Sequence, residues 1–188
     1  MMGLDLPDTR TLALESVDNL RSTVATAEQA QLAELETAIL AASRVFVSGA
    51  GRSLLAMRFF AMRLMHIDIR SYIVGEVTTP SIQPGDLLVL ASGSGRTDTQ
   101  VTLARKAKQQ GASVALVTAA DQTAVEIPAD HIVHVQVRPV RGDLAGIVPA
   151  GNVFEQSVVV VLDAVISSLM ARTGTPLSRI MGNHANLE

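Results

Sequence analysis

Short runs of branched aliphatic residues alternate with helical stretches from residue 44 onward, and this alternation limits the fold more than any other feature of the sequence. Strands are predicted at residues 44–48, 69–74, 87–91, 114–118 and 132–137, with helices at 53–65, 97–110 and 152–172 and a short helix near Leu177. Parallel strands are joined by right-handed crossovers through a helix, so strands at this spacing assemble side by side. We therefore expect one doubly wound α/β domain with a five-stranded parallel sheet.

The first 43 residues differ from the rest of the chain. Residues 9–43 hold neither glycine nor proline and are rich in alanine, leucine, glutamate and glutamine, which favour helices. Apolar residues such as Leu12, Leu20, Leu35 and Ile39 recur at broadly helical spacing, which predicts one long helix or two consecutive ones. We divide the chain into an N-terminal helical extension over 1–43 and a single globular unit over 44–188. The extension carries more apolar surface than one domain covers, so we expect it to pack against another subunit.

Composition narrows the class of protein further. Hydrophobic residues make up 48% and aromatic residues only 3%, so the core is aliphatic, as in a buried parallel sheet. A net charge of −3 argues against nucleic-acid binding, which needs a basic surface. The absence of cysteine excludes disulfides and thiolate metal sites, and we expect no metal or cofactor. The N-terminal residues lack the basic flank of a signal peptide, and Asp163 interrupts the late apolar run, so we expect a cytoplasmic protein with no membrane association.

Two loops follow predicted strands at the edge where open parallel sheets bind ligands. The first is SGAGRS, over Ser48–Ser53, and the second is ASGSGRTDT, over Ala91–Thr99. The glycines, among them Gly49 and Gly51, let the backbone approach an anion closely, and each loop leads into a helix N-terminus whose free N–H groups attract negative charge. These features together favour a phosphate group as the ligand.

Hydroxyl groups complete the predicted phosphate cup. Ser92, Ser94 and Thr97 lie in the second loop, and Ser53 from the first loop is placed to close the cup from the side. Neither loop holds a lysine or matches the P-loop pattern, and the first loop is not G-x-G-x-x-G, so triphosphate hydrolysis and dinucleotide binding are unsupported. The alternative is that these residues simply cap helices. We favour phosphate binding because three hydroxyls and two glycines exceed what one cap requires.

These motifs resemble a known family. The second loop, preceded by GAGRS, is similar to the sugar isomerase (SIS) domain family of phosphosugar isomerases and binders. Within that family the chain most resembles the 6-phospho-3-hexuloisomerases, through GAGRS, VGEVTTP, NVFEQS and the terminal HANLE. The resemblance implies a flavodoxin-like three-layer fold, a homotetramer and no cofactor. It also implies interconversion of D-arabino-hex-3-ulose 6-phosphate and D-fructose 6-phosphate in the ribulose monophosphate route of formaldehyde fixation, and a functional pairing with hexulose-6-phosphate synthase.

The resemblance also assigns roles to individual residues. It maps the phosphate cup onto Ser53, Ser92, Ser94 and Thr97 and the catalytic base onto Glu155, which moves a proton between C2 and C3 through a cis-enediol. His184 is suited to shuttle a proton between O2 and O3, since imidazole titrates near neutral pH, and the resemblance suggests that a neighbouring subunit supplies it. Without the resemblance, Glu155 reads as an ordinary first-turn acid of a helix and His184 as an exposed residue of the tail.

Weaker candidates for substrate binding complete the set. Arg52 either reaches the sugar or phosphate or is a solvated arginine at a helix start. Glu76 and Thr78 either line the site or belong to a turn before Pro80. Two other functions stay open: a different SIS isomerase, such as one acting on arabinose 5-phosphate, and a non-catalytic sugar-phosphate-binding domain.

Overall fold

A five-stranded parallel sheet lies at the centre of the computed structural model, which describes residues 8–137 and 152–187. The strands are β1 (Val45–Gly49), β2 (Ser71–Ile73), β3 (Leu87–Ala91), β4 (Ser113–Thr118) and β5 (His131–His134). The helices are α1 (Thr9–Val24), α2 (Gln29–Ala41), α3 (Arg52–His66), α4 (Asp98–Gln109), α5 (Asn152–Thr173) and α6 (Leu177–Gly182), with a short 3-10 turn, η1 (Gln122–Ala124). The predicted strands and helices are all present.

The strand order is β2-β1-β3-β4-β5, and every neighbouring pair is parallel. This is the flavodoxin-like order, and it confirms the expected three-layer α/β fold. The order reverses direction between β1 and β3, and ligands of such sheets bind outside the carboxyl ends of the strands at this switch point.

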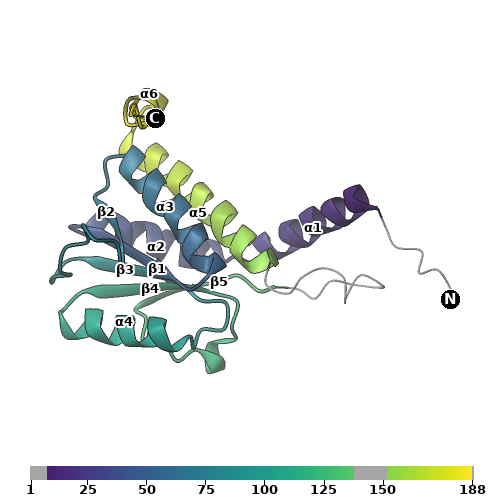
Figure 1. Cartoon of the computed structure of the whole chain (residues 1–188), viewed down its shortest axis with the longest axis horizontal. Coiled ribbons are helices and arrows are strands. Elements are labelled where there is room, and N and C mark those ends of the chain that lie inside the picture. Colours follow the sequence, from purple (N-terminus) through teal and green to yellow (C-terminus); the bar gives the residue numbers. More distant parts are fainter. Residues whose placement is uncertain (1–7, 138–151, 188) are drawn as a thin grey trace.

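Helices cover both faces of the sheet (Figure 1). Alternate strand residues point to opposite sides, so Val45, Val47 and Val89 join the core formed with α2, α3 and α5, whereas Phe46 and Leu90 join the core formed with α4. All five residues of β1 and of β3 are buried, as expected for central strands of a parallel sheet. The core is aliphatic, as the composition indicated.

The two outer strands are shorter than predicted. β2 pairs with β1 over three residues, and β5 pairs with β4 over four. After β5 the amide of Val135 still donates to the Thr118 carbonyl of β4, and the amide of Gln136 donates to the hydroxyl of Thr26. An edge strand has one neighbour only, so aliphatic residues extend beyond the hydrogen-bonded segment.

The N-terminal region consists of two consecutive helices, one of the two predicted forms. α2 contributes Leu35 and Ile39 to the core beneath the sheet. α1 lies against α5 and extends away from the sheet (Figure 1), and Thr23 is the one residue of α1 that is buried. The division of the chain at residue 43 stays a prediction; the structure adds that α2 packs with the globular unit.

α5 is long and apolar enough to cross a membrane by length and composition alone, but half of its apolar window is buried inside the protein. Val158, Leu162, Val165 and Leu169 pack in the core, which is the behaviour of a central helix in a globular domain.

Candidate active site

The two glycine-rich loops lie side by side at the switch point of the sheet. Gly49, the last residue of β1, is in register with Ala91, the last residue of β3. The loops that start at these paired residues lead into α3 and α4. The structure therefore brings together the two segments that the sequence predicted as a phosphate cup.

The loop after β3 is closed by its own hydrogen bonds. The hydroxyls of buried Ser92 and of Thr97 hydrogen-bond to each other at 2.9 Å, and the amide of Gly95 donates to the Ser92 carbonyl at 3.1 Å. The hydroxyl of Thr118, at the end of β4, donates to the same carbonyl at 2.7 Å. Gly95 has a φ of +65°, a backbone conformation that favours glycine. Thr118 is a supporting residue that the sequence analysis missed, because only the strand pairing places it beside the loop.

The capping alternative does not describe this loop. Thr97 occupies the N-cap of α4, but within the described chain its side chain makes no capping bond, since its hydroxyl faces Ser92. The hydroxyl of Ser94 accepts only a long 3.4 Å bond from the amide of Arg96, before the helix begins. In the first turn of α4 the amide of Gln100 donates to the Thr97 carbonyl at 2.8 Å, whereas those of Asp98 and Thr99 make no hydrogen bond within the described residues. A phosphate at a helix N-terminus is an acceptor for such amides.

The loop after β1 is tighter still. A side-chain carbon on Gly49 would lie 2.8 Å from backbone atoms of Ser53 and Leu54, so only glycine allows the first turn of α3 to approach the strand. Gly51, with a φ of +55°, stands at the N-cap of α3. Ser53 is buried in the first turn of that helix. These contacts fix Ser53 against the end of β1, the strand that pairs with β3.

Glu155 lies at the start of α5, at the same end of the sheet. The preceding residue, Phe154, packs its ring on the second loop, with a carbon 3.2 Å from the Cβ position of Gly93. The Glu155 side chain is 16% exposed, and its Oε2 lies 3.7 Å from Nε of Arg52. That oxygen is buried and accepts no hydrogen bond from the described residues. A buried carboxylate oxygen without a hydrogen-bond partner is unusual in folded proteins and indicates a ligand or a catalytic role.

Glu155 and Arg52 face a small hollow between α3 and α5, about 160 Å³ in volume. Its other lining residues are largely apolar and are Leu55, Ala56, Phe59, Gln156 and Val159. Arg52 is the first residue of α3 and its side chain is 58% exposed, yet it lies 3.7 Å from the candidate base, so both interpretations of this residue stay open.

The weaker candidates after β2 lie apart from this pair. Glu76 forms an ion pair with Arg58 on the outer side of α3, and Thr78 is exposed. The hydroxyl of Thr79 donates to the Ile73 carbonyl and closes the turn. This geometry supports turn formation as the role of this segment within one chain.

His184 lies at the opposite end of α3 from Arg52 and Ser53. Its ring packs against that of His66, with ring centroids 4.5 Å apart. α3 has 15 residues, so this end is about 20 Å from the start of the helix. The His184 of the same chain is therefore remote from Glu155, and its expected action in a neighbouring subunit's site stays a prediction.

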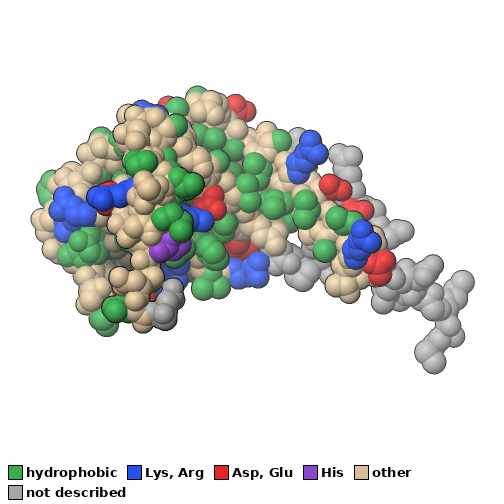
Figure 2. All heavy atoms as spheres, turned by 90° about the horizontal axis from the view of Figure 1, so that it is seen from above, with side chains coloured by type: hydrophobic (Ala, Val, Ile, Leu, Met, Phe, Trp, Pro, Cys, Tyr) green, Lys and Arg blue, Asp and Glu red, His purple; other side chains and the backbone are tan. Residues whose placement is uncertain are grey.

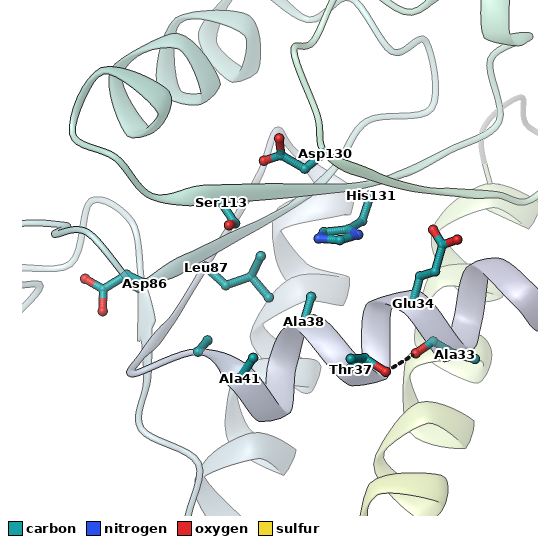
Figure 3. Close-up of a pocket in the computed structure, with 12 residues that line it drawn as sticks. Ala33, Glu34, Thr37, Ala38, Ala41, Asp86, Leu87, Ser113, Asp130 and His131 are labelled. Atoms are coloured by element: carbon teal, nitrogen blue, oxygen red, sulfur yellow. Dashed lines mark hydrogen bonds between the residues drawn. The ribbon is translucent and has the colours of Figure 1, made fainter.

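A larger hollow of about 780 Å³ lies at the amino ends of the strands, opposite the two loops. It is formed between α2 and the starts of β3, β4 and β5 (Figure 3). Its lining includes the carboxylates of Glu34, Asp86 and Asp130, which repel a phosphate. Asp86 is paired with Arg44, and Asp130 is paired with Lys108. Across residues 8–137 and 152–187, no three His, Asp or Glu side chains converge to hold a metal ion.

Comparison with known proteins places this geometry in a family. Residues 38–164 match the model of the SIS domain. The chain belongs to the SIS domain family. It is 44% identical to a 3-hexulose-6-phosphate isomerase of Methylomonas aminofaciens over 79% of this chain and 82% of the relative. It is 36% identical to a 3-hexulose-6-phosphate isomerase of Bacillus subtilis over 93% of this chain and 96% of the relative.

A solved structure supports the same family. A hypothetical protein of Methanococcus jannaschii, whose crystal structure infers a molecular function of 3-hexulose-6-phosphate isomerase, superposes with a TM-score of 0.81. The two sequences are 36% identical, and the alignment covers 93% of this chain and 99% of the other. The family resemblance inferred from the sequence motifs is therefore confirmed. Membership of the SIS domain family explains the order of the strands in the sheet.

Proposed function

We propose that the chain interconverts D-arabino-hex-3-ulose 6-phosphate and D-fructose 6-phosphate. The observation that carries the proposal is the buried oxygen of Glu155, which accepts no hydrogen bond from the described residues and lies at the same end of the sheet as a hydroxyl-lined loop. Most of this chain aligns with 3-hexulose-6-phosphate isomerases. An isomerase of this kind needs an anion site for the phosphate and one carboxylate for the proton. This chain supplies both.

The phosphate is held by the cup formed from Ser53, Ser92, Ser94 and Thr97. The hydroxyls donate to the phosphate oxygens, and the first-turn amides of α4 add backbone donors. Gly49 and Gly51 keep the first loop close to the cup. Binding at the phosphate orients the middle carbons of the sugar toward α5, which converts the proton transfer into an intramolecular step.

Glu155 moves the proton. Starting from the 3-hexulose, its carboxylate removes the proton from C2, and the C2 electron pair forms the C2–C3 double bond of a cis-enediol as O3 takes up a proton. The protonated Glu155 then returns a proton to C3 while O2 loses its own, which leaves the carbonyl at C2. Arg52 lies beside the carboxylate and is placed to stabilise negative charge on the enediol oxygens.

His184 of a neighbouring subunit carries the proton between O2 and O3 in this proposal. Exposed apolar residues along α3, the α3 stripe, consist of Leu55, Phe59, Met62 and Met65. Val17 of α1 and Val160 of α5 are also exposed, and Figure 2 shows hydrophobic side chains along this side of the molecule. Such a surface fits a second copy of the chain.

The symmetry of a dimer joins the two halves of the site. A two-fold axis near the middle of the α3 stripe places the end of one α3 beside the start of the other. His184 of the partner subunit then lies near Arg52 and Glu155, and the reverse contact forms at the second site. The homotetramer, the cytoplasmic location, the ribulose monophosphate pathway and the pairing with hexulose-6-phosphate synthase belong to this proposal through the resemblance of the sequence motifs.

Deuterium exchange tests the proposal. Fructose 6-phosphate is incubated with the protein in deuterium oxide, and exchange at C3 is followed by NMR. We expect exchange and formation of the 3-hexulose with the native protein, and a loss of about 10²- to 10⁴-fold in Glu155→Gln, because the amide accepts no proton. Glu34→Gln, at the opposite edge of the sheet, serves as the matched control and is expected to retain the native rate.

The same assay, run with arabinose 5-phosphate as a second substrate, separates the alternative functions. Isomerisation of arabinose 5-phosphate without exchange into fructose 6-phosphate would assign another SIS isomerase. Binding of fructose 6-phosphate with no exchange would assign a non-catalytic sugar-phosphate-binding domain.

A further inference from the structure

The end of α3 carries a backbone conformation that is unusual for its residue type. Asp68 has a φ of +65°, and no other non-glycine residue among 8–137 and 152–187 has a positive φ. This conformation is unfavourable for residues with a side chain, although aspartate tolerates it better than most. Here it ends the helix in a common way, because the amide of Asp68 donates to the Met65 carbonyl at 3.1 Å and the amide of Ile69 donates to the Leu64 carbonyl at 2.9 Å. The function of Asp68 is therefore argued from its side-chain contacts.

Within the described residues, the hydrogen bonds and the ion pair of the Asp68 side chain are made with the C-terminal segment. The Asp68 carboxylate forms an ion pair with Arg179 of α6 and accepts a hydrogen bond from the side-chain amide of Asn183 at 3.1 Å. The same amide donates to the backbone carbonyl of His66 at 3.0 Å. The sequence analysis did not identify Asn183 as a functional candidate. Its role depends on a corner of the chain that is distant in sequence.

Polar contacts add to a small apolar contact in holding this segment in place. α6 has six residues, none of them fully buried, and its Ile180 packs partly buried against the core. A helix of this length does not form by itself in water, so its position depends on these tertiary contacts. Arg179 and Asn183 are the polar contacts that lie nearest to His184 in the sequence.

His66 provides the surface on which the next residue rests. His66 is 1% exposed, and its Nδ1 has no hydrogen-bond partner within the described residues. The ring of His184 covers it, with centroids 4.5 Å apart and planes tilted by 41°. Burial lowers the pKa of His66, and repulsion from His184 and Arg63 lowers it further. The other charged groups at this corner, Asp68 and Arg179, neutralise each other.

We propose that His66, Asp68 and Asn183 form a socket that positions His184 for its action in the neighbouring subunit's site. The socket residues are positioning residues, since none of them touches the substrate. The inference rests on the proposed function, because it assigns the socket a purpose only if His184 takes part in the reaction. The socket lies at the end of the α3 stripe, where a two-fold partner brings its own Arg52 and Glu155.

Two substitutions release His184 without disturbing the core. Asp68→Gly removes the carboxylate, and glycine adopts the positive φ freely, so the turn itself is preserved. Asn183→Ala removes the amide that bonds to His66 and Asp68. We expect both variants to lower kcat for fructose 6-phosphate about 10-fold and to change KM by less than about twofold, because the phosphate cup is intact. Hydrogen–deuterium exchange over residues 177–187 is expected to accelerate in both.

Three further variants make the test specific. Asp68→Asn keeps an acceptor for Asn183 and tolerates the positive φ, so we expect it to retain most of the native kcat. Ser178→Ala, an exposed change on the same short helix, is expected to behave as the native protein. His184→Ala sets the lowest rate that loss of the socket can produce.

Each outcome decides between the claims. Unchanged amide hydrogen exchange over residues 177–187 in Asp68→Gly and Asn183→Ala would overturn the socket. So would accelerated amide exchange with a native kcat in these variants, if His184→Ala is impaired. Both results would leave the proposed function intact. Full activity in His184→Ala would overturn the role of His184 and, with it, the purpose of the socket. If the native protein catalyses no deuterium exchange at C3 of fructose 6-phosphate, the proposed function itself fails.

Discussion

At the scale of single residues, the site depends on groups that have little freedom to move. Glu155 keeps one oxygen buried beside Arg52, and that oxygen accepts no hydrogen bond within the described part of the chain. The Ser92 and Thr97 hydroxyls hydrogen-bond to each other. Groups held in this way need little reorganisation when a substrate binds. The glycines that allow this approach are as important as the polar groups.

Gly49 offers the sharpest test at this scale. A methyl group there would meet the backbone of Ser53 and Leu54 at 2.8 Å, so Gly49→Ala forces the first turn of α3 away from β1. We expect a loss of about 1–3 kcal/mol in the free energy of unfolding and a raised KM, because Ser53 moves with the helix. Urea denaturation and steady-state kinetics measure the two effects.

Gly182→Ala is the matched control, because a side chain there meets nothing within 4 Å and its φ is not positive. A Gly49→Ala protein with native stability and native KM would refute the tight packing of the first loop.

At the scale of secondary-structure elements, α3 links the two ends of the molecule. It begins at the phosphate cup with Ser53 and ends at the buried His66, where α6 is attached. One face of the helix packs in the core and the other carries the α3 stripe. The helix therefore links the loop that holds Ser53, the exposed α3 stripe and His66 of the proposed socket in one element.

The buried imidazole at the end of α3 predicts a pH dependence of stability. The pKa of His66 is lowered by burial below its ordinary value of 6.5, so the unfolded chain binds this proton more readily than the folded one. The contribution of neutral His66 to the free energy of unfolding is fully present above about pH 6.5. It is lost as the pH falls from there through the lower pKa that His66 has in the folded protein. We expect His66→Leu to lose less unfolding free energy than the native protein between about pH 7.5 and 5.5 in urea titrations.

His184→Ala provides the comparison for this effect. We expect it to reduce the pH dependence by less than His66→Leu, because burial is a larger cause of the pKa shift than repulsion from His184. Equal slopes in the native protein and His66→Leu would exclude a neutral buried histidine at this position.

At the scale of the whole molecule, the two proposed catalytic residues lie far apart within one chain. Glu155 is at one end of α3 and His184 at the other, about 20 Å away. The exposed stripe between them provides a surface for a second copy. The protein is thus expected to work only as an assembly.

Mixed oligomers test this expectation. Glu155→Gln and His184→Ala proteins are unfolded together, refolded and assayed. A hybrid pair then keeps one site with native Glu155 and a native His184 from the other chain, so random pairing restores about a quarter of the native activity. The separately refolded variants serve as controls. No recovery, with hybrids demonstrated by mass spectrometry, would mean that each chain supplies its own His184.

Much of the fold follows from local pattern. Buried runs such as residues 87–91 and 114–118 predict central strands because their neighbours on both sides and both faces are apolar. The outer strands were predicted too long, since the number of hydrogen-bonding neighbours, rather than residue type, ends a strand at a sheet edge. Two consecutive helices and one long one were not distinguished over residues 9–43, because the segment between them has no helix breaker.

By itself, the sequence determined the parallel sheet and the family, and it predicted a phosphate site at the two loops, because these inferences depend on residues that are neighbours along the chain. Only the tertiary structure decided that Arg52 faces Glu155, that Glu76 pairs with Arg58 instead, and that Asn183 and Asp68 hold the end of the chain against His66. Those contacts join segments far apart in sequence. Their geometry is set by how helices pack on the sheet, which no local pattern of residues specifies.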